Sequence, residues 1–154
     1  MYQKILVPID GSPTAELGLA EAIKLARLTG ATLRLVHIVD ELSLSMATGY
    51  GMTYTVDVLG LLQEAGSALL LKAEAQVRAA GVPVDSVLSD NLQGRVCDQV
   101  VQQAQAWRAD LIVLGTHGRR GARRLFFGSD AEAILRYAPV PVLLVRAPES
   151  RPAT

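Results

Sequence analysis

Five short strand-like runs alternate with helical patterns along this chain, and this alternation limits the fold more than any other feature. The runs cover residues 4–9, 32–39, 82–89, 110–115 and 140–146. The first of them, KILVPI, is continuously apolar, which is typical of a strand buried on both faces of a sheet. Helices between successive strands favour parallel strands joined by crossovers. The alternation therefore predicts a single α/β domain over residues 1–147, a doubly wound parallel sheet with helices on both faces, and a polar tail at 148–154.

Start and stop signals predict the helices between these strands. Ser12 before Pro13 is typical of an N-cap followed by a first-turn proline, and Gly30 is typical of a helix end. The apolar spacing then predicts a long helix over 56–80 and a shorter one over 96–109. The irregular stretch 40–55 between the second strand and the long helix is either a flexible flap or a plain connection.

The helix predicted over 96–109 carries two residues with chemical potential. Its expected apolar face consists of Val96, Val100, Val101, Ala104 and Trp107. Trp107 is expected to take part in core or helix packing rather than to form a ligand platform. Cys97 is the only cysteine, so no intrachain disulfide can form and a reducing compartment is expected. It is either a nucleophile or, as we favour, an ordinary half-buried thiol.

The composition limits the classes of function. Half of the residues are apolar and the formal net charge is zero. A disordered chain would be poorer in apolar residues, and a general nucleic-acid or membrane-surface binder would carry net charge. The apolar stretch at the start is too short for a signal peptide, and no run approaches the length of a membrane span. We therefore expect a soluble cytoplasmic protein that binds neither membranes nor nucleic acid.

The segment 115–129 stands out because it combines four glycines with four arginines. The glycines are residues 115, 118, 121 and 128, and the arginines are residues 119, 120, 123 and 124. Glycine-rich turns that lead into a helix N-terminus form anion sites, and arginines neutralise phosphate charge. The alternatives are a mobile loop and a merely solvated basic face. Neither GxxxxGK[ST] nor GxGxxG after the first strand is present, which argues against two common phosphate motifs.

Two histidines raise the question of catalysis. His117 lies in the glycine-rich segment, but no nucleophile, base and orienting group are visible beside it. We expect it to contact a ligand or to be exposed, so efficient turnover is not expected. His37, at the end of the second strand, is expected to be a structural histidine with its hydrogen bonds satisfied.

The spacing Gly115-x2-Gly118-x9-Gly128-Ser129 resembles the ATP-binding signature of the universal stress protein family. The stretches KILVPIDGS, VHIVD and GSDAEAILRYAPVPVLLVR are also similar to that family, in the same order along nearly the whole chain. The resemblance implies a five-stranded parallel sheet with strand order 3-2-1-4-5. In this arrangement the strand order, not the strand direction, reverses between the first and fourth strands, where ligands bind in such sheets.

The resemblance also implies a set of ATP-binding residues. They are Pro8, Ile9, Asp10, Ile38, Gly115, Thr116, His117, Gly118, Arg119, Gly128, Ser129, Asp130 and Ala131. Asp10 would touch ribose, or water on a bound Mg²⁺. Asp130 departs from the family, which often has an apolar residue there. It either points into solvent as a first-turn acid, which we favour, or weakens ATP binding or orders a metal.

Three functions follow as hypotheses. The leading one is a small ATP-binding regulatory protein of the stress response, with at most weak ATP hydrolysis. The alternatives are a slow ATPase or adenylyl-transfer enzyme, and an interaction module that uses no nucleotide. The apolar strand over 140–146, placed at a sheet edge by Pro139 and Pro141, predicts a homodimer, and the resemblance implies antiparallel pairing of this strand.

Overall fold

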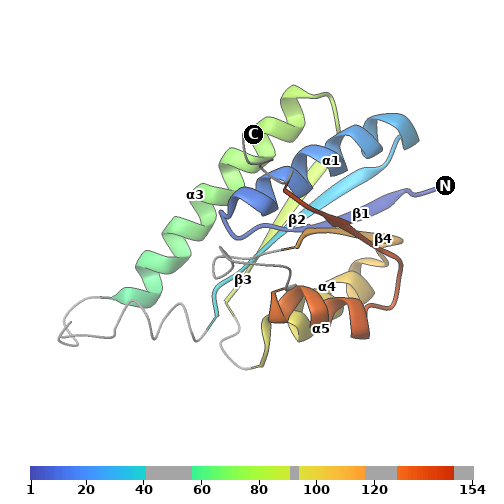
Figure 1. The fold of residues 1–154 in the computed structure, drawn as a ribbon. Coiled ribbons are helices and arrows are strands. Elements are labelled where there is room, and N and C mark those ends of the chain that lie inside the picture. Colours follow the sequence, from blue (N-terminus) through green and yellow to red (C-terminus); the bar gives the residue numbers. More distant parts are fainter. Residues whose placement is uncertain (41–56, 91–93, 117–127, 148–154) are drawn as a thin grey trace, which may run out of the picture.

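A computed structural model describes residues 1–40, 57–90, 94–116 and 128–147 of the chain. Strands and helices alternate in these ranges, as the sequence predicts (Figure 1). The elements are β1 Lys4–Pro8, α1 Pro13–Thr29, β2 Thr32–Ile38, α3 Val58–Ala79, β3 Val84–Ser89, α4 Val96–Trp107, β4 Leu111–Gly115, α5 Ser129–Tyr137 and β5 Val142–Val145. Most of the 40–55 stretch and the 148–154 tail lie outside the described residues. None of the helices in these ranges is both long enough and apolar enough to cross a bilayer.

The five strands form one parallel sheet in the order β3-β2-β1-β4-β5, which confirms the predicted topology. β1 is the central strand, and its Ile5 lies opposite Leu33 of β2 on one side and Leu111 of β4 on the other. Because β1 leads to β2 on one side and pairs with β4 on the other, the strand order reverses at the carboxyl end of β1.

Two hydrophobic cores cover the two faces of the sheet. Ile5 and Val7 of β1 belong to the core beneath α1 and α3, whereas Leu6 belongs to the core against α4 and α5. All three side chains are 0% exposed. The continuous apolar run at the start of the chain is therefore a strand buried on both faces, with one pair of helices on each side (Figure 1).

Local hydrogen bonds explain where the helices begin and end. Ser12 caps α1, with its Oγ accepting from the N–H of Ala15 at 3.2 Å, and Gly30 ends it in the left-handed conformation at φ 73°. The long helix begins at Val58 rather than at residue 56. The reason is that Asp57 caps it, accepting from the N–H of Gly60 at 2.9 Å.

The buried face of α4 differs from the face that apolar spacing predicts. Its buried residues are Cys97, Gln99, Val100 and Ala104. Gln99 is only 4% exposed, and its Oε1 accepts from Ser89 Oγ of β3 at 2.6 Å. The predicted member Val101 is only partly buried, and Cys97 is fully buried rather than half-buried. A glutamine satisfied by a distant serine cannot be recognised from hydrophobic periodicity.

Trp107 packs at the amino end of the sheet, as expected. It lies against the core formed with α4 and α5, and the guanidinium of Arg34 stands 4.7 Å from its ring centroid. Arg34 also makes a bidentate ion pair with Asp85 of β3, in which Nε and Nη2 donate to the two carboxylate oxygens at 2.8 and 2.7 Å. These contacts join α4 to β2 and β3 at the end of the sheet opposite the predicted site, so Trp107 has an architectural role.

Candidate functional site

The carboxyl ends of β1, β2 and β4 hold the first group of predicted site residues. Ile9 continues from β1, and its N–H donates to the carbonyl of Val36 in β2 at 2.8 Å. Ile38 is the last residue of β2, and Gly115 the last of β4. Because the strands are parallel, these residues all lie at the carboxyl end of the sheet, where the strand order reverses.

The turn after β1 fixes the carboxylate of Asp10. Its Oδ1 accepts a hydrogen bond from the N–H of Ser12 at 2.8 Å, as in an Asx turn. Gly11 between them has φ 79°, a conformation that residues with a side chain adopt only with strain. Because Ser12 in turn caps α1, the position of Asp10 is coupled to the start of that helix.

His37 of β2 is hydrogen-bonded to the same end of β1. Its ring is 6% exposed, and Nδ1 lies 2.7 Å from the carbonyl oxygen of Ile9. A carbonyl only accepts, so Nδ1 donates this bond. The ring also packs closely against Gly66 of α3, where an added Cβ would stand 2.5 Å from the histidine Cδ2. His37 is thus a structural histidine, as predicted.

Gly115 is a glycine because a helix approaches it, which is a reason the sequence does not reveal. A Cβ at this position would stand 2.5 Å from the carbonyl oxygen of Thr14 and 2.6 Å from its carbonyl carbon. Gly18, one turn further along α1, has its own ideal Cβ position 3.3 Å from the Gly115 nitrogen. The first turns of α1 therefore rest on the end of β4, and the missing side chain at residue 115 serves this packing.

The two ends of the glycine-rich segment meet at the start of α5. The N–H of Gly128 donates to the carbonyl of Thr116 at 3.0 Å, and Gly128 is the N-cap of the helix. Ser129 and Asp130 are exposed in the first turn, whereas Ala131 is buried. The first N–H groups of a helix have no partner within it, and α5 has no side-chain cap, so its backbone favours an anion here, whereas Asp130 and Glu132 add negative charge to the same turn.

The middle of this segment, residues 117–127, lies outside the described residues. The predicted contacts of His117, Gly118 and Arg119, and the role of the other arginines, therefore stay predictions. Among the described residues, no group of three or more His, Cys, Asp or Glu side chains is placed to hold a metal ion.

The nucleophile alternative for Cys97 is disfavoured by its surroundings. The thiol is 1% exposed, and burial, together with the nearby carboxylate of Asp98, raises the pKa of Cys97. The reactive form of cysteine is the thiolate, which a raised pKa depletes at neutral pH. Cys97 is therefore a packing residue of α4.

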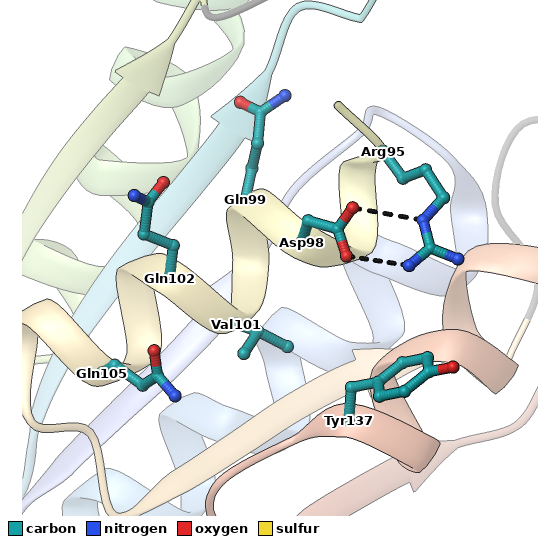
Figure 2. A pocket seen from close by; sticks show the side chains of 7 residues that line it. All are labelled: Arg95, Asp98, Gln99, Val101, Gln102, Gln105 and Tyr137. Atoms are coloured by element: carbon teal, nitrogen blue, oxygen red, sulfur yellow. Dashed lines mark hydrogen bonds and ion pairs between the residues drawn. The ribbon is translucent and has the colours of Figure 1, made fainter. Parts of the chain in front are cut away.

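An open pocket that sequence analysis did not find lies beside α4, toward the end of α5 (Figure 2). It is lined by Arg95, Asp98, Gln99, Val101, Gln102, Gln105 and Tyr137. Arg95 makes a two-pronged pair with Asp98 at 3.1 and 3.0 Å, so its charge is compensated. None of the predicted site residues lines this pocket, and its compensated charge suits a polyphosphate poorly.

Comparisons with known proteins find one family over nearly the whole chain. The profile of the universal stress protein family matches residues 1–146. A universal stress protein of Methanocaldococcus jannaschii is 31% identical over 150 residues, covering 97% of this chain and 85% of that protein. A universal stress protein of Thermus aquaticus is 37% identical over 153 residues, covering 95% of this chain and all of the relative.

Solved structures share the fold. The universal stress protein from Archaeoglobus fulgidus in complex with dAMP has a TM-score of 0.66 and 28% identity, and the alignment covers 94% of this chain and 98% of that protein. A universal stress protein in complex with cAMP has a TM-score of 0.66 and 22% identity, and the alignment covers 94% of this chain and 97% of that protein. Because the cAMP complex is only 22% identical to this chain, its similarity shows a shared fold and nothing more.

Proposed function

Because this chain belongs to the universal stress protein family, whose members are stress-response proteins, we propose that it is an ATP-binding regulator. Its ATP site lies at the carboxyl ends of β1 and β4 and at the start of α5. The likeness to a family member that was solved with dAMP supports an adenine nucleotide as the ligand.

One observation carries the proposal. The signature Gly115-x2-Gly118-x9-Gly128-Ser129 begins at the end of β4 and ends at the start of α5, and a hydrogen bond of 3.0 Å from Gly128 N to Thr116 O joins its two ends. The signature therefore closes a loop at the strand-order reversal, beside a helix N-terminus that favours a phosphate.

The proposed site residues contact the nucleotide from two sides. Pro8, Ile9 and Asp10 line the adenine and ribose side together with Ile38, which is partly buried at the end of β2. Asp10 contacts ribose, or water on a Mg²⁺ that accompanies the phosphates. On the other side, Gly115 and Thr116 of the β4 end, the N-cap Gly128, and Ser129, Asp130 and Ala131 of α5 face the phosphates. His117, Gly118 and Arg119, which lie outside the described residues, are expected to wrap the ribose and phosphates.

The protein binds its nucleotide with at most weak hydrolysis, since the sequence shows no nucleophile, base and orienting group around His117. We place it in the cytoplasm, in keeping with its single, buried cysteine. Its partner besides ATP is a second copy of the chain, joined by antiparallel pairing of β5. That strand lies at an edge of the sheet, and Leu143 is 38% exposed there.

The first experiment identifies the nucleotide that copurifies with the protein. The purified protein is denatured and the released molecules are identified by mass spectrometry. ATP alone supports the regulator, ADP together with ATP supports slow hydrolysis, and the absence of any nucleotide supports the interaction module.

Calorimetric titration with ATP then tests the site. Gly118→Val should abolish binding, because a branched side chain occupies the space of the phosphates. Ser129→Ala should cost only about 1 kcal/mol, since it removes one hydrogen bond among several. Circular dichroism confirms that both variants fold. A folded Gly118→Val protein that binds ATP normally would contradict the proposed site.

A further inference from the structure

The outer face of α3 carries apolar side chains that nothing in the described structure covers. α3 lies over β2 and β3 and buries Gly66, Leu70, Ala73 and Val77 against them. On the opposite side of the helix, Leu61 is 52% exposed and Leu71 is 68% exposed. Exposing leucines to water is unfavourable, so this face gains if another apolar surface covers it.

Small residues separate the two leucines on this face. Ala65, Ala68 and Ala75 are all exposed. An α-helix turns about 100° per residue, so these alanines and the two leucines lie within an arc of about 120°. The face therefore combines two large apolar side chains with three small ones, and the small ones leave grooves into which the ridges of a second helix can pack.

Two opposite charges lie on the same face. Glu64 and Lys72 are exposed, and no ion pair among the described residues joins either of them to another group. Glu74 and Arg78, further along α3, do pair with each other at 2.8 Å. Glu64 and Lys72 stand eight positions apart, about 12 Å along the axis, with Ala68 midway between them.

The face is complementary to itself when the helix direction is reversed about Ala68. Reversal places Glu64 opposite Lys72, so each acid meets a base. It also places Leu61 opposite Ala75, and Leu71 opposite Ala65, so each large side chain meets a small one. We propose that a second copy of this chain packs its α3 antiparallel on this face, with the two-fold axis passing beside Ala68.

This interface is separate from the pairing of β5 proposed above. α3 covers β2 and β3, whereas β5 forms the other edge of the sheet. One copy therefore pairs through β5 with one neighbour and through α3 with another. A single helix pair buries less surface than a standard stable interface, so the α3 contact is the weaker of the two and forms at higher concentration.

The first test adds a bulky charge at the two-fold axis. In Ala68→Arg two arginines meet at the centre, whereas the matched control Ser67→Arg places the same side chain on the flank of the face, and both positions are exposed. Sedimentation equilibrium over a range of micromolar concentrations should give a lower average mass for Ala68→Arg than for the unmodified protein and Ser67→Arg. Equal masses for all three proteins would overturn the proposal.

The second test exchanges the charges. Glu64→Lys and Lys72→Glu should each weaken the α3 association about tenfold, because each places like charges opposite one another twice per dimer. The double variant Glu64→Lys/Lys72→Glu restores both pairs, and so does an equimolar mixture of the two single variants. Restored mass in the double variant and the mixture supports self-pairing of α3. Single variants that associate normally, or a mixture that stays as weak as its parts, would show that the face does not pair with itself.

Discussion

Replacing Gly115 by alanine tests whether the first glycine of the signature serves the fold. The added methyl would stand 2.5 Å from the carbonyl oxygen of Thr14 and 2.6 Å from its carbonyl carbon. Both are backbone atoms of α1, so no side-chain rotation relieves the contact. The helix would have to move as a unit, although Leu19 is 3% exposed and Ala22 is 0% exposed in the core beneath it.

The cost follows from this geometry. Overpacking of a well-packed site costs about 1–3 kcal/mol, and a clash with two backbone atoms belongs to the upper part of that range. We expect Gly115→Ala to lower the free energy of unfolding by about 2–3 kcal/mol, which corresponds to a fall in Tm of roughly 5–10 °C for a chain of this size.

Gly18→Ala is the matched control because it fills the other side of the same contact. Its methyl would lie 3.3 Å from the Gly115 nitrogen, a tight distance that a small shift relieves. Alanine is also favoured over glycine within a helix by about 1 kcal/mol. The two effects offset each other, so this variant should stay within about 1 kcal/mol of the unmodified protein.

Urea denaturation followed by circular dichroism measures both variants without nucleotide. If Gly115→Ala unfolds at the same urea concentration as the unmodified protein, α1 accommodates the methyl and the packing argument is wrong. If both variants are destabilised equally, the clash is not specific to the strand end.

Further predictions follow from the same structure. Asp10→Ala should weaken ATP binding in calorimetry while the circular dichroism spectrum stays unchanged, because Asp10 lies after β1 and outside both cores. Leu143→Arg should shift the protein from dimer to monomer in light scattering, whereas charges at Val142 and Leu144, which pack against a core, should also lower Tm. Hydrogen bonds from Ser86 and Arg78 lower the pKa of Glu74 from its ordinary value near 4.5. Its contribution to stability is therefore present above the ordinary pKa and lost as pH falls through the lowered value. Glu74→Gln should flatten that part of the pH profile of urea stability.

Local signals in the sequence predicted the elements well. The N-cap at Ser12, the proline after it and the glycine at residue 30 act on neighbouring backbone groups, so they can be recognised without knowing the fold. The strands appear as apolar runs for the same reason, and their observed bounds differ from the predicted ones by a residue or two. The strand order followed from the family resemblance and not from any local signal.

Features that depend on distant partners could not be predicted. Gln99 of α4 can be buried because Ser89 of β3 donates a hydrogen bond to its side-chain oxygen, and the two residues come from different elements. The pocket beside α4 arises where Tyr137 of α5 comes near Arg95, with 5.8 Å from the guanidinium to the ring centroid. Neither pairing leaves a spacing in the sequence, because the first depends on how α4 packs on β3 and the second on how α4 packs beside α5.

The glycine signature contains positions that the fold itself requires and positions that it does not require. Gly115 faces Thr14, so a chain with this fold needs a small residue there whether or not it binds a nucleotide. Gly128 caps α5 with φ −56° and ψ 147°, a conformation that many residues adopt, so the backbone alone does not require glycine there. Among the described residues of the signature, Gly128 and Ser129 are therefore the positions that the fold alone does not explain, and Gly118 lies outside the described residues. Loss of ATP binding without loss of stability at these positions is the result that would separate a binding site from an architectural turn.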